Sequence, residues 1–483
     1  MDNQPVQGNT PSNPRRKRRT KMQIFKEAYL PFITLAVATL LIIGLVVGIV
    51  SCTKEDPDPT EPTGSAPNTQ LQMEVDALLE EAKALALAYE YDAALQLLQQ
   101  FNGDVSQFPL LQSAIYEYTA ITHNMVSWTA NEVPNFSFHV LLTDLTSALK
   151  DPTYGESGNN RYNKNFVTIG EFSTILRRLY ENGYVLVSLS DLFSYSEQNG
   201  KYVYSEKTLM LPEGKKPILL TETHCNYYTY MIDSTGDGLA DAGGAGFASK
   251  LCWDNDFYNE LVTTNGSVVT GAYDLVPILE NFIKLHPDFS YKGARAILAF
   301  SGYDGIFGYR VTSDDLSGDA LAKEQADATV LVNALKEAGY TIACYTYGNI
   351  DYSVKSAQAV KTDIEAWQNY IAPIVGQTDI LVFAQDSDIG TSYENNEKFD
   401  ILYAHGYRFF LGSTPFLSCE IQDAYVRHNR LMVTGSTLYH HPETFSQFFS
   451  LKDLLDLRRN NIPAYQKCAE QSAHNFYKEF VWN

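Results

Sequence analysis

The chain has 483 residues, a length that predicts two or three structural units. Of these residues, 45% are apolar and 19% charged, which is typical of a globular protein and not of a disordered one. Its formal net charge is −21, yet the first 28 residues hold seven basic side chains against two acidic ones, so the remainder carries about −26. Such an acidic body repels phosphate backbones, which argues against nucleic acid as a partner.

The N-terminal part of the chain predicts a membrane anchor. A basic tail, residues 1–27, precedes residues 28–51, which are uncharged and dominated by Leu, Ile, Val, Ala and Gly. About 20 apolar residues span a bilayer as a helix. We therefore expect a single-pass transmembrane helix with the basic tail in the cytoplasm and the body outside it.

Two alternatives place the body on the same side. A cleaved secretory signal has an apolar core of about 7 to 15 residues, shorter than this one. The run ending at Cys52 resembles a bacterial lipobox, which would make the chain a lipoprotein anchored at Cys52.

A linker and a helical region follow the anchor. Residues 52–70 are rich in Pro, Asp, Glu, Thr and Ser without apolar periodicity, which predicts an extended linker. Within residues 71–132, helical spacing predicts a hairpin over residues 71–100 and another helix over residues 110–125. The hairpin resembles one tetratricopeptide unit. Because a lone unit cannot bury its own apolar face, we expect it to pack on the main domain or self-associate, and a protein partner is the alternative.

Residues 133–483 read as one α/β domain. Short apolar strands alternate with amphipathic helices, which favours a barrel or barrel-like sheet built from βαβ units. The expected strands are residues 136–142, 184–189, 217–220, 294–300, 341–345, 380–383 and 408–411, and the expected helices are residues 169–182, 320–338, 357–374, 395–405, 453–459 and 464–480.

The third of these strands organises the domain. Its apolar run, residues 217–220, ends abruptly in Thr221, Glu222, Thr223, His224 and Cys225. A buried parallel strand delivers functional groups at its C-terminal end in this way, although an ordinary core strand entering a polar loop gives the same pattern.

Several runs in residues 133–463 resemble the polysaccharide deacetylase family, carbohydrate esterase family 4. They are Phe138-His139, residues 168–172, residues 179–185, residues 216–221, residues 338–343 and residues 346–348. The resemblance implies a distorted (β/α) barrel and a metal-dependent deacetylase, whose strand motif Thr-Phe-Asp-Asp-Gly provides a base and a metal ligand and whose His-Ser/Thr-x-x-His motif provides two further ligands.

The chain departs from these motifs at the positions that carry the chemistry. The base slot reads Thr223, the first ligand slot His224, and the two histidine slots Tyr345 and Asn349. Thr223 is no base at neutral pH, a tyrosine hydroxyl has an ordinary pKa near 10, and an amide offers only a neutral oxygen. A third family motif falls at residues 384–386. The resemblance therefore implies the scaffold and leaves the activity uncertain.

A rebuilt zinc site is the alternative that keeps the enzyme active. His224 is a weak candidate ligand, with Cys225 and Cys344 at the ends of strands that should approach each other. Alternation along a strand turns Cys344 away from Tyr345 and Cys225 away from His224, which weakens this hypothesis. The same alternation turns Glu222, a possible replacement base, away from the slot of Thr223.

A calcium loop is possible after the central strand. Asp233, Thr235, Asp237 and Asp241 occupy loop positions 1, 3, 5 and 9, with Gly238 at position 6. The acidic ligand expected at position 12 is replaced by Gly244, so a Gly-rich surface turn is the competing interpretation.

Two further loops contain candidate sugar-binding residues. Tyr303, Tyr309 and Arg310 follow an expected strand, and Asp388 follows another. Tyrosine rings and an arginine donor suit a sugar, whereas a loop packed by its own aromatics would look the same.

The sequence thus favours a membrane-anchored extracytoplasmic polysaccharide deacetylase-like protein with impaired catalysis that binds cell-wall or other glycan. An active deacetylase with non-standard ligands, and a scaffold acting through the helical hairpin, are the alternatives. We expect no cofactor at the family site, zinc if the enzyme is active, and calcium at the Asp233 loop if that loop binds metal.

Overall fold

The computed structural model describes residues 69–148, 161–198, 201–233, 235–237, 239–240, 246–312, 316–414, 416–451 and 454. Several expected segments lie outside the described residues. They are the anchor, the linker up to residue 68, and the helices over residues 453–459, of which only residue 454 is described, and 464–480. All of the described residues belong to one compact unit of the chain. In the described part of the chain, no helix has the length and apolarity needed to cross a membrane.

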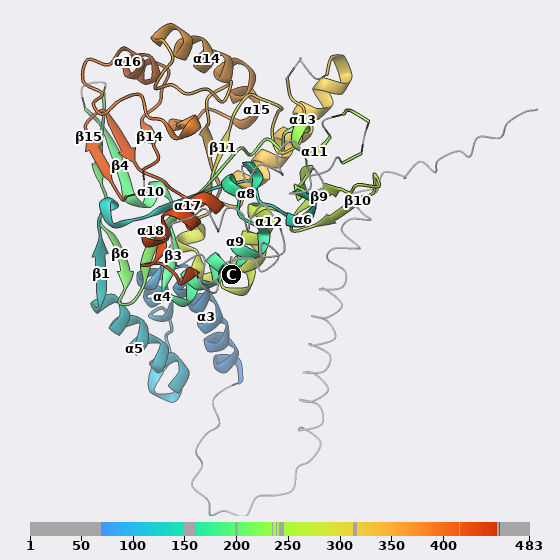
Figure 1. The fold of residues 1–483 in the computed structure, drawn as a ribbon. Helices are drawn as coiled ribbons and strands as arrows, with labels where there is room; N and C mark the ends of the chain where they lie inside the picture. Colours follow the sequence, from blue (N-terminus) through green and yellow to red (C-terminus); the bar gives the residue numbers. More distant parts are fainter. Residues whose placement is uncertain are drawn as a thin grey trace, which may run out of the picture. The chain divides into compact units, whose positions relative to one another are not determined.

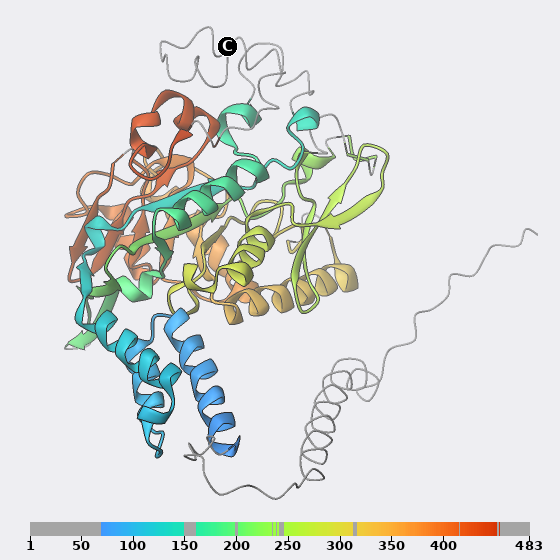
Figure 2. The same cartoon turned by 90° about the horizontal axis from the view of Figure 1, so that it is seen from below.

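A three-helix arm opens the described chain. It consists of α3 (Thr69–Leu87), α4 (Tyr91–Leu98) and α5 (Pro109–His123), and it projects from the body in Figures 1 and 2. The arm has a small hydrophobic core of its own, formed by Val75, Ala82, Ala94, Leu98, Phe101, Phe108 and Leu111. The third helix thus helps to bury the face that a lone hairpin would leave exposed.

The body is organised around one curled sheet. Its order is β15-β16-β14-β13-β12-β11-β7-β2-β17, with β3 beside the first half of β7, and every pair except β15 with β16 is parallel. The strands are β2 (Asn135–His139), β3 (Tyr184–Leu186), β7 (Lys216–Thr223), β11 (Ile297–Phe300), β12 (Thr341–Cys344), β13 (Ile380–Val382), β14 (Phe409–Leu411), β15 (Cys419–Gln422), β16 (Tyr425–His428) and β17 (Leu431–Met432).

The sheet curls back on itself. A parallel bridge between Ser413 and Arg430 joins the end of β14 to the start of β17, which pairs with β2. This curled sheet with helices outside fits the expected distorted barrel.

Helices cover the outer face of the sheet. They are α9 (Ile169–Glu181), α12 (Leu275–Leu285), α13 (Gly318–Glu337), α14 (Ala357–Tyr370), α15 (Ala372–Val375) and α16 (Glu397–Ala404) (Figure 1). Helix α9 shows how the sequence sets the ends of such a helix: Thr168 and Glu171 form a capping box at its start, and Gly183 takes φ +80° just after its end. The outer face buries Phe138, Phe300 and Trp367, whereas the inner face buries Ala299, Ala343 and Tyr345.

Short elements surround this framework. They are α6 (Leu145–Ala148), α8 (Arg161–Asn165), α10 (Leu189–Leu192), α11 (Thr229–Ile232), α17 (Gly435–His440), α18 (Pro442–Phe445), the pair β1 (Met125–Trp128) and β6 (Leu209–Pro212), the hairpin β4 (Phe193–Gln198) and β5 (Lys201–Glu206), and the sheet β8 (Lys250–Trp253), β9 (Phe257–Val262) and β10 (Val268–Gly271).

Candidate functional site

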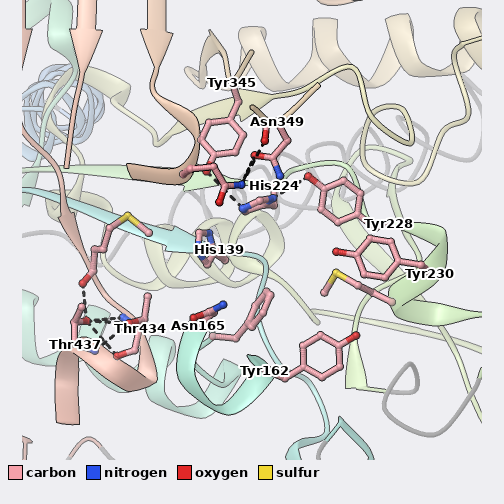
Figure 3. A pocket seen from close by; sticks show the side chains of 14 residues that line it. His139, Tyr162, Asn165, His224, Tyr228, Tyr230, Tyr345, Asn349, Thr434 and Thr437 are labelled. Atoms are coloured by element: carbon pink, nitrogen blue, oxygen red, sulfur yellow. Dashed lines mark hydrogen bonds between the residues drawn. The ribbon is translucent and has the colours of Figure 1, made fainter. Parts of the chain in front are cut away.

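A cavity of about 290 Å³ opens at the C-terminal ends of the parallel strands. Figure 3 shows its two imidazoles, His139 and His224, at the centre, with Tyr228 and Tyr230 on one side and Thr434 and Thr437 on the other. The lining residues are His139, Tyr162, Asn165, Phe166, His224, Tyr228, Tyr230, Met231, Tyr345, Asn349, Gln385, Met432, Thr434 and Thr437. All of these side chains are neutral or, in the case of the histidines, titratable, and none is a carboxylate.

His224 stands at the turn that ends β7. It has φ +60°, a left-handed conformation that is uncommon for a residue with a side chain and is often found at functional sites. Its Nδ1 lies 2.8 Å from the hydroxyl of Tyr228, and its Nε2 lies 3.5 Å from the hydroxyl of Tyr345. Two phenols thus bracket the imidazole and fix its orientation in the cavity.

His139 reaches the same cavity from the neighbouring strand. The register of β2 and β7 pairs His139 with Thr223, and the two imidazole rings pack edge to face with centroids 4.6 Å apart. Thr223 donates its hydroxyl proton to the carbonyl oxygen of Phe138 at 3.2 Å, so its oxygen is left to accept from Nδ1 of His139 at 2.8 Å. This assignment leaves Nε2 of His139 as a hydrogen-bond acceptor.

The pKa of His139 is lowered to about 3, first by burial and second by the positive charge of Arg430. The imidazole is therefore neutral at physiological pH, and its low basicity makes it a poor general base there. Arg430 itself is fully buried and donates to Ser137 and to backbone carbonyls of the barrel.

The loop after β12 supplies Tyr345 and Asn349. Asp363, on α14, accepts hydrogen bonds from the backbone N–H groups of Tyr347 and Gly348, both at 2.7 Å. Gln385, in the third family motif, donates to the backbone and side-chain oxygens of Asn349 at 3.3 and 3.4 Å. The four family slots thus lie together, with His224, Tyr345 and Asn349 lining the cavity and Thr223 buried behind His139.

The other sugar-binding candidates are distributed differently. Tyr303 is exposed, and its ring lies 5.5 Å from that of Tyr228 at the rim. Tyr309 packs under the ammonium group of Lys250, and Arg310 donates to the backbone oxygens of Asp304 and Tyr227. These last two candidates hold the loop together and do not line the cavity.

Asp388 lies in a separate cavity, in contact with Arg427.

The expected calcium loop is described only in part, because Asp241 lies outside the described residues. Oδ1 of Asp233 accepts hydrogen bonds from the backbone N–H groups of Gly236 and Asp237 at 2.6 and 3.3 Å, and from the hydroxyl of Thr235 at 3.3 Å. This carboxylate oxygen thus organises a turn, and calcium binding by the loop stays a prediction.

The rebuilt zinc site is not assembled. Cys225 and Cys344 are buried in the core between sheet and helices, while His224 faces the cavity. Cys225 donates to the carbonyl oxygen of Glu222 at 3.4 Å, and Glu222 itself faces the same outer core. Side-chain alternation separates these groups, as the sequence indicated.

Comparisons with known proteins relate the chain to deacetylases at a distance. No protein-family model matches the chain, and no curated protein does. Two solved structures are similar: a deacetylase from Streptococcus pyogenes, PplD, in complex with acetate (13% identity, TM-score 0.33, covering 68% of this chain and 99% of that one), and a de-N-acetylase from Aggregatibacter actinomycetemcomitans (12% identity, TM-score 0.34, covering 66% and 99%). This likeness is too distant to assign a function, which must come from the cavity itself.

The donor set does not fit the zinc that a deacetylase of this kind would hold. Zinc sites use three or four ligands from His, Cys, Asp and Glu. Among the described residues, no three such side chains converge. In the cavity lining, His139 and His224 are the two side chains of these types, and the groups beside them are a phenol, Tyr345, and an amide, Asn349.

Sequence reasoning missed most of the cavity lining. Tyr162, Tyr228, Tyr230, Thr434 and Thr437 come from helices and loops with no motif of their own. His139 was visible only as part of a family-like run, since its role depends on its register with Thr223, 84 residues later. The signal that could have found it is position: His139 is the last residue of a buried strand, and His224 directly follows the last residue of the neighbouring one.

Proposed function

We propose that this chain is a polysaccharide deacetylase-like protein that binds an amino-sugar glycan in the His139–His224 cavity without hydrolysing it. The observation that carries the proposal is the lining: tyrosine rings, amides and hydroxyls surround two imidazoles, with no carboxylate among the lining residues. Such walls offer flat apolar faces and neutral hydrogen-bonding groups, which suit an uncharged sugar.

The same residues support the part of the proposal that concerns hydrolysis. Deacetylation of this type needs a metal to polarise the carbonyl and a base to take a proton from water. Thr223 is buried with its hydroxyl engaged, and His139 has a pKa lowered to about 3. Neither group can accept a proton from water at neutral pH.

The binding test uses purified full-length protein and acetylated chito-oligosaccharides, measured by calorimetry. Tyr230→Ala, at the half-exposed rim, should weaken binding about two- to tenfold through the loss of one stacking contact. Tyr116→Ala is the matched control, because Tyr116 is an exposed tyrosine on the helical arm. Absence of binding by the parent protein would contradict the proposal.

The catalytic test combines elemental analysis with an acetate-release assay in added zinc, cobalt or nickel. We expect background turnover and no stoichiometric metal. Bound metal together with turnover that His224→Ala abolishes would establish the alternative, an active deacetylase. Conversely, the quadruple change Thr223→Asp, His224→Asp, Tyr345→His and Asn349→His should create zinc binding, because it restores three ligands that line one cavity and a base in the slot beside it.

For localisation we propose a single membrane span at residues 28–51 with the body extracytoplasmic, and a lipid anchor at Cys52 as the alternative. The support is the uncharged apolar run after a basic tail. Protease added to intact cells stripped of outer barriers should remove the body, and its protection would contradict this topology. Incorporation of labelled fatty acid that Cys52→Ser abolishes would identify the lipid anchor instead.

A further inference from the structure

A second and larger cavity lies on the same face of the barrel. It measures about 530 Å³ and is formed by the loops after β13 and β14 and by the β15–β16 hairpin. Because β13, β14 and β16 are parallel to β7 and β12, their C-terminal ends meet at the edge where the His139–His224 cavity opens. We call it the distal cavity.

A third cavity, of about 250 Å³, lies between the two. It shares Met432 and Thr437 with the His139–His224 cavity, and it shares Ser413 and Thr414 with the distal cavity. Cavities that share wall residues lie side by side, so the three form a row from the imidazoles past α17 to the β15–β16 hairpin. We call this row the groove.

Exposed aromatic rings stand at both ends of this groove. At the imidazole end, Tyr230 and Tyr303 are 44% and 54% exposed, and the Tyr230 ring stacks on Tyr228 at 5.5 Å. At the distal end, Phe416 is 62% exposed. Its loop is fixed by the buried amide of Asn429, which donates to the carbonyl oxygens of Thr414 and Phe416 at 3.0 and 2.8 Å.

The charge of the distal cavity selects against anions. Arg427 contacts Asp388 at 2.8 Å and Glu420 at 2.9 Å, and it also donates to the backbone oxygens of Thr391 and Gly390. Burial alone would raise the pKa of Glu420. The hydrogen bonds from Tyr425 and Arg427 outweigh burial, so the pKa lies below its ordinary value and this carboxylate is ionised. The carboxylates of Asp388 and Glu420 thus outnumber the single guanidinium of Arg427, which is already bound to both of them. The distal cavity is therefore acidic, in a chain of net charge −21.

We infer that the three cavities form one binding groove for a linear oligosaccharide of neutral or cationic sugars, with one unit in the His139–His224 cavity and further units reaching Phe416. This inference rests on the proposed function and adds the length and charge of the ligand. A polyanionic glycan of equal length is excluded by the acidic distal cavity.

The experiment measures affinity for acetylated chito-oligosaccharides of increasing length, from one to six units. Affinity should rise with length in the full-length parent protein, because longer chains reach the distal cavity. Phe416→Ala should reduce affinity for the hexamer about two- to tenfold and leave the dimer unchanged, whereas Tyr230→Ala should weaken both. Tyr116→Ala again serves as the matched control.

The outcomes separate the two claims. If dimer and hexamer bind equally and Phe416→Ala changes neither, the extended groove is wrong while the proposed sugar site stands. If no oligosaccharide binds, the proposed function itself fails. An oligogalacturonide hexamer that binds as tightly as the chito-hexamer would overturn the charge selectivity, and its exclusion supports it.

Discussion

Glu222 and Asp274 form a buried pair of carboxyl groups on the outer face of β7, behind the cavity. Burial is the main cause that raises the pKa of Glu222, and the charge of Asp274 adds to it. Asp274 is placed to be the ionised partner, since its Oδ1 accepts a hydrogen bond from the backbone N–H of Leu141 at 2.9 Å. The pair is thus built to hold a proton at pH values where an exposed glutamate has lost it.

Replacing Glu222 by Gln should stabilise the protein at neutral and alkaline pH. A carboxyl whose folded-state pKa is raised contributes stability that is complete below its unfolded pKa of about 4.5 and is lost as pH rises through the folded value. Glu222→Gln keeps a donor toward Asp274 at every pH, so its melting temperature should exceed that of the parent by a margin that grows between pH 5 and pH 9. Differential scanning calorimetry across this range measures the effect.

Glu337→Gln, on the exposed side of α13, is the control and should follow the parent. If the difference in melting temperature between Glu222→Gln and the parent stays constant as pH rises, Glu222 is already ionised in the folded protein and the prediction is wrong.

At the scale of elements, the cavity depends on loops held by helices. Asp363 is the clearest case, because one carboxylate on α14 binds two backbone N–H groups of the β12 loop and accepts from the hydroxyl of Tyr352 at 2.7 Å. Within that loop, Thr346 and Asn349 have φ of +60° and +51°. A β-branched residue such as Thr346 is rarely found there, so the loop needs this external support.

Asp363→Asn should loosen the β12 loop and weaken ligand binding. An amide offers one acceptor oxygen in place of two and turns an N–H₂ group toward a backbone donor, which should cost about 1–3 kcal/mol of stability. Urea unfolding measures this loss, and calorimetry with the chito-hexamer measures the effect on the cavity. Asp351→Asn, whose carboxylate accepts from Ser353 at the exposed part of the same loop, is the control and should cost less. Equal losses for the two variants would contradict the role given to Asp363.

The elements that sequence could predict are those whose signal is local. The strands at β7, β12, β13 and β14 were expected because each is a short apolar run between polar segments, and the helix at α9 because of its amphipathic pattern and the glycine after it. The sheet β8–β10 and the hairpin β4–β5 were not expected. Their side chains are partly exposed on both faces, so apolar alternation is weak. The cavity escaped prediction for another reason, since contacts such as His139 with Thr223 depend on register between distant strands.

At the scale of the whole described unit, the helical arm and the cavity lie at opposite ends of the barrel strands. The arm contacts residues 288–292, which precede β11, whereas the cavity follows the strands' C-terminal ends. Its attachment centres on Tyr89 at the α3–α4 corner: the hydroxyl donates to the carbonyl oxygen of Asp288 at 2.7 Å, and the ring lies 5.7 Å from that of Tyr291. Beside it, the N–H of Lys292 donates to the carbonyl oxygen of Ala88 at 3.1 Å. A separate core and one main point of attachment suggest that the arm can open without the barrel.

Tyr89→Ala should detach the arm while leaving the cavity intact. The side chain is 6% exposed, and truncating a buried aromatic residue costs about 3–5 kcal/mol, so amide exchange in α3 and α4 should accelerate by roughly a hundredfold or more. Exchange in β7 and β12, and affinity for chito-oligosaccharides, should stay at the parent's values. Hydrogen–deuterium exchange followed by mass spectrometry resolves these segments, with Tyr116→Ala as the control for an exposed tyrosine on the same arm. If exchange rises equally in β7, the arm is an integral part of the barrel's folding unit, and a scaffold role for the arm could not then be separated from the cavity by mutation.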